Sequence, residues 1–215
     1  MKAVIAGSTG EIGKYLLQFL LADESFTEVT SLVRRRSLIE HQRLHNLSID
    51  FERINELPLS KFDVLFITLG TTIKNAGSQE AFRKVDLDYV VDLAQWGKQC
   101  GASQVHIVSS MGANAKSSVF YSRVKGEMQE SVKAVGIEKT YFYQPSLLDS
   151  EREEKRTGER IGVILFRLLR LLFVGPLKKY ASIKVEDVAK GMWLKSKDAF
   201  DGVHIIPSDK ILLTE

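Results

Sequence analysis

Residues Lys2 to Gly13 read KAVIAGSTGEIG, and this stretch is more informative than any other part of the sequence. It starts with a short apolar run, typical of a buried strand, and continues with three glycines spaced G-x-x-G-x-x-G. The apolar residues that follow recur at helical spacing, at Ile12, Leu16, Phe19 and Leu20. A strand, a glycine turn and a helix start form a phosphate-binding corner, because glycine admits the anion and the helix N-terminus attracts it. The stretch therefore predicts a dinucleotide site.

Strands and helices alternate along most of the remaining sequence. Further strands are predicted at residues 28–33, 48–54 (a weak pattern), 63–68, 104–109 and 139–144. Two helices are predicted from apolar stripes, one formed by Phe82, Val85, Tyr89, Leu93 and Trp96 and the other by Val124, Met128, Val132 and Val135. This order predicts an α/β fold, a Rossmann-like doubly wound parallel sheet with helices on both faces. We expect one NAD(P)-binding domain over residues 1–215, with a small substrate-side extension of helices and a strand from about residue 146.

Composition and charge exclude several classes of protein. The chain has 215 residues, of which 44% are hydrophobic and 27% charged, and its net charge of +3 is too small to favour nucleic acid as a partner. Its one cysteine, Cys100, excludes an internal disulfide and fits a reducing compartment. The first strand starts at the N-terminus, so we expect no signal or transit peptide and a cytoplasmic location. The four histidines lack ligand spacing, and we predict no metal site.

A catalytic group is suggested by hydroxyls, a phenol and an ammonium on neighbouring segments. Tyr121 and Lys125 are four residues apart at the start of a predicted helix, which places them on one face. A phenol is a weak acid near neutrality, and a nearby ammonium favours its ionised form. Ser109 and Ser110 follow the strand at 104–109, where a hydroxyl could hold a substrate carbonyl while Tyr121 donates its proton.

These residues resemble the short-chain dehydrogenase/reductase superfamily, in particular its atypical branch and the Tat-interacting-protein-like oxidoreductase group. The matching stretches are GSTGEIG (7–13), LVRR (32–35), TLGTT (68–72), KVDLDYV (84–90), SSMGA (109–113), YSRVKGEM (121–128), PSLL (145–148) and the charged run at 152–159. The resemblance covers about three quarters of the chain and implies NADP(H) binding and a Ser-Tyr-Lys site. Gln144 departs from the family, where an arginine commonly precedes the proline.

The resemblance also implies a role for individual residues. The glycine turn would hold the pyrophosphate through Gly7, Thr9, Gly10, Glu11, Ile12 and Gly13. Leu69 and Gly70 would lie beside the adenosine half of the cofactor, and Leu148 and Arg156 near the nicotinamide. Tyr121 would be the proton donor, and Lys125 would assist it and hold the nicotinamide ribose. The serine–tyrosine spacing leaves Ser109 and Ser110 hard to separate, and we favour Ser110.

The end of the strand at 28–33 bears on the choice of cofactor. A carboxylate commonly stands there when NAD is bound, and it would repel the 2′-phosphate of NADP. This chain instead has Arg34, Arg35 and Arg36, and guanidinium groups suit phosphate by charge and geometry. We therefore predict NADP(H). A basic surface turn or a short nucleic-acid patch is the alternative.

Two functions from different classes remain open. The first is an NADPH-dependent reductase of a small carbonyl substrate, and the second is a regulatory protein that binds NADP(H) and changes partners with its redox state. Tyr121 and Lys125 favour the enzyme, because a sensor needs neither. A nucleotide-sugar epimerase is a third reading, which the short stretch after Pro145 disfavours.

The segment 161–174, IGVILFRLLRLLFV, is apolar except for Arg167 and Arg170. We predict a helix that roofs the substrate pocket or joins two subunits of a homodimer, and a buried core helix is the alternative. Its 14 residues are too few to span a bilayer, which needs about 20. Transient docking on a membrane surface, helped by Lys178 and Lys179, is a minor alternative.

Overall fold

A computed structural model describes residues 1–35, 39–149, 181–197 and 199–213 of the chain. Its first half contains β1 (Lys2–Ala6), α1 (Glu11–Ala22), β2 (Glu28–Val33), β3 (Leu44–Ser48), the 3₁₀ helix η1 (Phe51–Glu56), β4 (Val64–Ile67), α2 (Ile73–Ala76), α3 (Gln79–Arg83), the π-helical turn η2 (Lys84–Asp88) and α4 (Tyr89–Gln99). The second half contains β5 (Gln104–Val108), α5 (Phe120–Val135), β6 (Lys139–Gln144), β7 (Leu148–Asp149), β8 (Ile183–Lys184), α8 (Val185–Lys197), β9 (Gly202–Pro207) and the 3₁₀ turn η5 (Ser208–Lys210).

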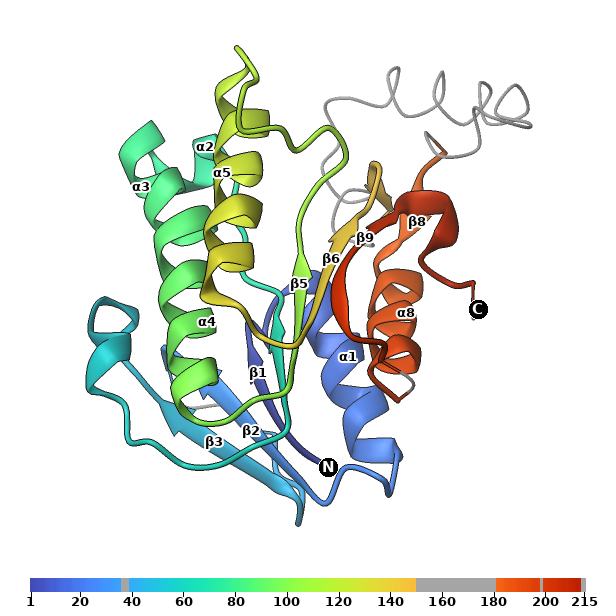
Figure 1. Ribbon diagram of the computed structural model, residues 1–215. Helices are drawn as coiled ribbons and strands as arrows, with labels where there is room; N and C mark the ends of the chain where they lie inside the picture. Colours follow the sequence, from blue (N-terminus) through green and yellow to red (C-terminus); the bar gives the residue numbers. More distant parts are fainter. Residues whose placement is uncertain (36–38, 150–180, 198, 214–215) are drawn as a thin grey trace.

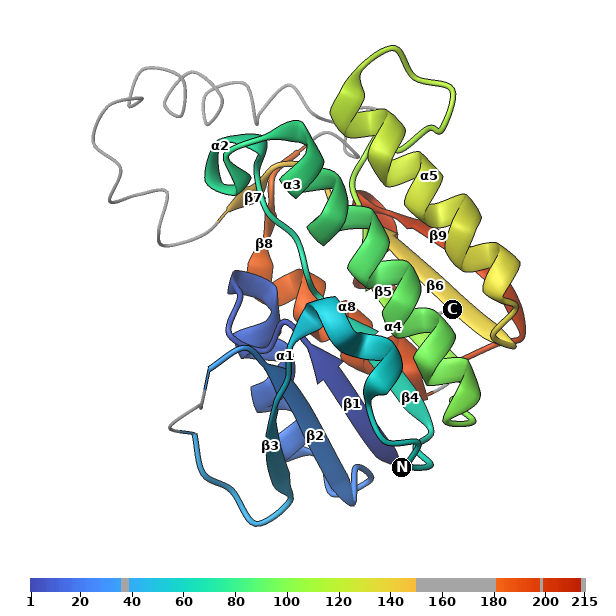
Figure 2. The same ribbon diagram turned by 90° about the vertical axis from the view of Figure 1, so that its left-hand side faces the viewer.

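The main sheet is parallel at every pairing, in the order β3-β2-β1-β4-β5-β6-β9. Helices α3, α4 and α5 cover one face, and α1 and α8 cover the other (Figures 1 and 2). The predicted Rossmann-like doubly wound α/β fold is confirmed. The carboxyl ends of the strands point towards the top of Figure 1, where α2 and the start of α5 lie. The loops predicted to carry function therefore gather at one edge of the sheet.

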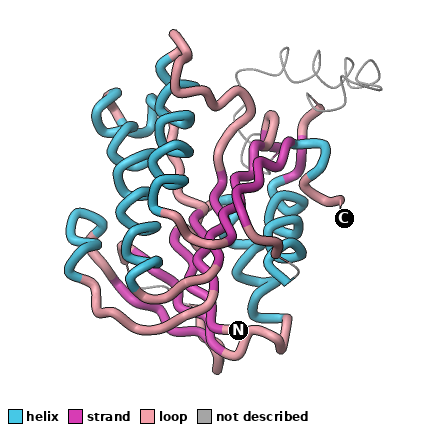
Figure 3. The backbone as a smooth tube through the Cα atoms, in the orientation of Figure 1, coloured by secondary structure: helices cyan, strands magenta, loops and turns pink. Residues whose placement is uncertain are grey.

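Each buried strand contributes to two separate cores, because successive side chains point to opposite faces. In β1, Val4 and Ala6 join the core beneath α4 and α5, whereas Ala3 and Ile5 join the core beneath α1 and α8. The tube view shows how thoroughly helix and strand alternate along the chain (Figure 3). This two-sided burial explains why the central strands read as continuous apolar runs.

The predicted strand at residues 48–54 is wrong. The third strand is β3, Leu44–Ser48, and the chain then forms η1. Most of β3 is exposed and polar because it is the edge strand of the sheet, so its sequence lacks an apolar pattern. Phe51 and Ile54 looked like strand residues, but their spacing of three buries both on one side of a 3₁₀ helix.

The predicted stripe of α4 also needs a correction. Val85 and Tyr89 were expected to face the core but are only partly buried, whereas Asp86 and Val90 are buried. The cause is η2, because a π turn adds a residue per turn and rotates the following residues about the helix axis. An acidic side chain is thereby brought to the inside of the molecule.

Candidate active site

The glycine turn after β1 is shaped by close backbone contacts. Gly7 has a φ of +99°, and a Cβ added there would lie 2.7 Å from Thr68 Oγ1. A Cβ on Gly13 would lie 2.1 Å from the carbonyl oxygen of Gly7. Gly7 and Gly13 are therefore required for the turn and for the approach of α1 to β1, whatever else they do.

The N-terminus of α1 has the properties of an anion site. Gly10 is the N-cap, and in the described structure no side chain accepts a hydrogen bond at this cap. Thr9 is exposed, Gly10 and Glu11 are partly buried, and Ile12 packs into the core. Unsatisfied N–H groups and the helix dipole favour a negative group here, so the corner fits the pyrophosphate of a dinucleotide.

Two of the three arginines predicted to bind phosphate lie within the described residues. Arg34 and Arg35 directly follow β2 and are both exposed, while Arg36 lies outside the described residues. Burial and Glu52 raise the pKa of the Tyr89 hydroxyl to about 12, and the charge of Arg34 opposes this rise. Arg34 therefore lies near Tyr89, the first residue of α4. Two exposed guanidinium groups at the carboxyl edge fit a phosphate.

The two serines after β5 have different surroundings. The hydroxyl oxygen of Ser109 accepts a hydrogen bond from Gln129 Nε2 of α5 at 2.6 Å. The hydroxyl of Ser110 is buried and has no hydrogen-bond partner among the described residues. A buried hydroxyl without a partner is costly, and a substrate oxygen could satisfy it. The geometry thus favours Ser110 as the serine that meets a ligand.

Tyr121 and Lys125 lie one turn apart on α5, in contrasting environments. The Tyr121 side chain is 37% exposed, and its ring packs against Phe82 of α3 with ring centroids 5.4 Å apart. The Lys125 side chain is buried. The phenol is therefore reachable from solvent, whereas the ammonium is held inside the molecule.

Lys125 is held by a residue to which the sequence analysis gave no role. Its Nζ lies 2.8 Å from Oδ1 of Asp86, and the two side chains are only 4% and 1% exposed. The signal was present, because Asp86 follows Phe82 by four residues and so stands on an apolar helical face. A carboxylate in such a position needs a buried partner.

The loop that leads from β5 to α5 is pressed closely against the helix. A Cβ on Gly126 would lie 2.0 Å from the amide nitrogen of Ala115, so only glycine fits beside Lys125. Asn114 N donates to the carbonyl oxygen of Ser122, and Met111 N donates to that of Pro145. The contacts of Asn114 and Gly126 tie the loop carrying Ser110 to the helix carrying Tyr121, and that of Met111 ties it to the segment after β6.

The remaining predicted site residues lie around this edge or outside the described structure. Leu69 follows β4 and packs against the core beneath α4, and Gly70 next to it is exposed. Leu148 begins β7, which pairs with β8. Arg156 and the predicted helix at 161–174 lie outside the described residues.

Within the described residues no helix is long and apolar enough to cross a membrane, and no group of three or more His, Cys, Asp or Glu side chains could hold a metal ion.

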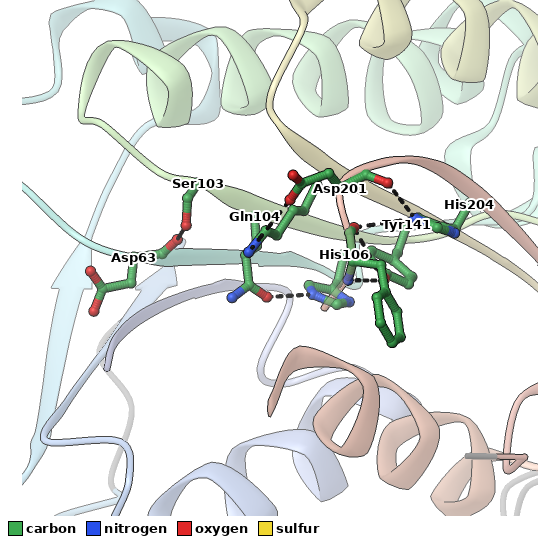
Figure 4. A network of polar contacts seen from close by, with 9 residues as sticks. Asp63, Ser103, Gln104, His106, Tyr141, Asp201 and His204 are labelled. Carbon is green, nitrogen blue, oxygen red and sulfur yellow. Dashed lines mark hydrogen bonds and ion pairs between the residues drawn. The ribbon is translucent and has the colours of Figure 1, made fainter. Parts of the chain in front are cut away.

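A second buried polar group lies away from this edge, between the sheet and α8 (Figure 4). His106 Nδ1 is 2.8 Å from the Tyr143 hydroxyl, and Nε2 is 3.2 Å from Gln104 Oε1. The imidazole stacks on Tyr141, which stacks in turn on His204. Burial, and secondarily the charge of His204, lowers the pKa of His106 to about 3, so this group is neutral.

The comparison with known families agrees with this geometry. Residues 3–143 match the NAD dependent epimerase/dehydratase family. The chain belongs to this family. The matched part contains the glycine turn, the Asp86–Lys125 pair and the serines after β5.

Two relatives refine the assignment. Protein HTATIP2 of Rattus norvegicus is 36% identical over 160 residues, which are 72% of this chain and 66%, just under two thirds, of that protein. This confirms the resemblance to the Tat-interacting-protein-like group. Protein FMP52-1, mitochondrial, of Scheffersomyces stipitis is 31% identical over 83% of this chain and 76% of its own length. Further fungal relatives are also named mitochondrial, and they contradict the expected cytoplasmic location, which rested only on composition and on where the first strand begins.

Solved structures support the fold at lower identity. MoeE5, in complex with UDP-glucose and NAD, superposes with a TM-score of 0.68 at 14% identity, over 96% of this chain and 75% of that one. At this identity the likeness concerns the fold alone. The family and the fold together make this chain an NAD(P)-binding, oxidoreductase-like protein.

Proposed function

We propose that this chain is an NADP(H)-dependent oxidoreductase that reduces a small carbonyl substrate by a Ser-Tyr-Lys mechanism. The observation that carries the proposal is the buried hydroxyl of Ser110, which has no hydrogen-bond partner within residues 1–35, 39–149, 181–197 and 199–213 and lies on a loop tied to the helix that bears Tyr121 and Lys125. Two neighbouring segments, the loop after β5 and helix α5, supply a hydrogen-bond donor, a phenol and an ammonium, and both begin at the carboxyl edge of the sheet, where the glycine turn also lies. A site that only binds the cofactor would need neither the Ser110 hydroxyl nor the Tyr121 phenol.

Each side chain has a part in the proposed reaction. When bound, the nicotinamide supplies a hydride to the carbonyl carbon. The Ser110 hydroxyl donates a hydrogen bond to the carbonyl oxygen and holds it. The Tyr121 hydroxyl gives that oxygen its proton, so that an alcohol forms. Lys125 stabilises the phenolate left on Tyr121 and holds the nicotinamide ribose.

The cofactor part of the proposal rests on Arg34 and Arg35. They would bind the 2′-phosphate that distinguishes NADP from NAD, while Thr9, Gly10, Glu11 and Ile12 would bind the pyrophosphate. Titration with NADPH and NADH, followed by nicotinamide fluorescence, tests this. We expect NADPH to bind more tightly, and Arg35→Ala to lower its affinity about tenfold while NADH binding stays unchanged. Arg53→Ala, at an exposed arginine of η1, is the control; equal or tighter binding of NADH by the parent would reject NADP specificity.

A regulatory protein that binds NADP(H) is the second candidate. The observation that favours it is the engagement of Lys125 by Asp86, which gives the lysine a structural use independent of catalysis. The two candidates differ in turnover. A panel of aldehydes and ketones, followed by the loss of NADPH absorbance, decides between them: steady oxidation that depends on one carbonyl supports the reductase, whereas tight binding without turnover of any supports the regulator.

A further inference from the structure

Asp86 connects two segments that the proposed function assigns to the cofactor. Its Oδ1 lies 2.8 Å from Lys125 Nζ, and its Oδ2 accepts a hydrogen bond from the backbone N–H of Thr71 at 2.9 Å. Thr71 belongs to the loop after β4, directly after Leu69 and Gly70. One carboxylate therefore fixes the ammonium of α5 and the backbone of the loop at the same time.

The local structure favours the buried Asp86–Lys125 pair, although burying the two charges costs free energy. The π turn η2 brings Asp86 inside, and such turns within helices are frequently found at functional sites. Gly70 lies against the carboxylate, since a Cβ added there would be 3.5 Å from Oδ1. Burying two charges is expensive even when they are paired, and an apolar pair would serve stability as well or better. The pair is therefore an unusual choice for packing alone.

We propose that Asp86 is a positioning residue of the cofactor site, which holds Lys125 and the Thr71 loop in register and sets the net charge beside the nicotinamide. The inference rests on the proposed function, in which Lys125 holds the nicotinamide ribose. With both partners present, the local charge of the pair is zero. The nicotinamide ring is cationic in NADP⁺ and neutral in NADPH, so the charge of the pair affects the two forms differently.

Opposite substitutions in the pair separate this role from a structural one. Asp86→Asn leaves the charge of Lys125 uncompensated and should weaken NADP⁺ more than NADPH. Lys125→Met leaves the carboxylate alone and should weaken NADPH more than NADP⁺. We expect the ratio of the two dissociation constants to move in opposite directions, by about tenfold in each variant, at low ionic strength. Asp88→Asn removes an exposed carboxylate from the same turn and serves as the matched control, with an unchanged ratio.

The double variant Asp86→Asn/Lys125→Met keeps the test usable if a lone buried charge prevents folding. It is neutral again, so its ratio should return to that of the parent while both forms bind more weakly. Equal losses for both forms in the single variants, or parent-like affinity in the double variant, would overturn the inference and leave the proposed function intact. If the parent binds neither NADP⁺ nor NADPH, the proposed function fails and the inference falls with it.

Discussion

The two faces of the sheet bury their polar groups in different ways. Beneath α8, His106, Tyr143 and Gln104 form a neutral group in which both imidazole nitrogens have partners. Beneath α4 and α5, Lys125 and Asp86 form a charged pair with exposures of 4% and 1%. A neutral network can rigidify a core at little electrostatic cost, whereas a buried charge pair loses much hydration energy. The costly group lies at the carboxyl edge of the strands, where ligands of such folds bind.

The largest expected effect on the α5 face is a loss of turnover, and it should come from Tyr121→Phe. The ring and its packing on Phe82 are kept, and only the proposed proton donor is lost. We expect turnover of a carbonyl substrate to fall by about 10²–10⁴-fold, the usual contribution of a positioned general acid. NADPH affinity and the thermal midpoint should stay close to those of the parent.

Tyr89→Phe is the control for this variant, because it also removes a hydroxyl, one that donates to Glu52 away from the predicted catalytic group. Its turnover should match the parent. If Tyr121→Phe reduces a confirmed substrate at the parent's rate, the proton donor has been assigned wrongly.

Removing one partner of the Asp86–Lys125 pair should lower the stability of the protein. Asp86→Asn leaves Lys125 buried without a counter-charge, and we expect the free energy of unfolding in urea to fall by about 3 kcal/mol. The double variant with Lys125→Met should be more stable than either single variant, since neither charge is then left alone. Equal, additive losses would mean that the two residues do not interact in the folded protein.

The neutral group predicts a dependence on pH instead. The folded state keeps His106 unprotonated down to a pKa of about 3, whereas a histidine in the unfolded chain titrates near its ordinary value of 6.5. Below pH 6.5 the unfolded state therefore binds a proton that the folded state does not. The contribution of neutral His106 to the free energy of unfolding is fully present above pH 6.5 and is lost as the pH falls towards 3. The loss is about 1.4 kcal/mol per pH unit, and hence about 2 kcal/mol by pH 5.

Chemical unfolding between pH 5 and 7.5 measures this slope. His106→Leu should be less stable at neutral pH, because the Tyr143 hydroxyl loses its partner, but its stability should fall less between pH 6.5 and 5. His45→Gln, at an exposed position of β3, is the control. An acid slope in His106→Leu as steep as in the parent would assign the effect to other groups.

The sequence predicted most of the fold because buried parallel strands and amphipathic helices have strong local signals. Strands β2 and β6 have the predicted bounds, and the fold class is confirmed. The errors fell where the local signal was weak or shifted: on β3, a polar edge strand, and on α4, where one π turn rotated the buried face.

The site was less accessible to sequence reasoning. Spacing alone placed Tyr121 and Lys125 on one helical face. The spacing of four from Phe82 marks Asp86 as a carboxylate on an apolar face, but its pairing with Lys125 follows only from the packing of η2 on α5. The different surroundings of Ser109 and Ser110 likewise depend on Gln129, which is 20 residues away in the sequence. Contacts of this kind depend on tertiary structure and leave no periodic pattern.

The last variant tests the close packing beside Lys125. In Gly126→Ala the added methyl would meet backbone atoms of Asn114 and Ala115 at 2.2 and 2.0 Å, so the loop must move. We expect a net loss of about 2–3 kcal/mol, because overpacking against backbone atoms outweighs the better helix propensity of alanine. Turnover should fall further than this loss implies, since the same loop carries Ser110.

Gly97→Ala on α4 is the matched control, because its added Cβ would meet the end of the flexible Leu65 side chain at 2.8 Å, away from the site. It should cost less stability than Gly126→Ala, because a side-chain end can move aside more easily than backbone, and it should leave turnover unchanged. Equal turnover in the two variants would mean that the loop tolerates displacement and that the contact of Gly126 with Ala115 serves packing alone. A loss of turnover in Gly126→Ala alone would show that catalysis on the α5 face depends on the position of this loop as well as on the charged pair. In the part of the chain that the structure describes, the neutral group beneath α8 has no such link to the loop that carries Ser110.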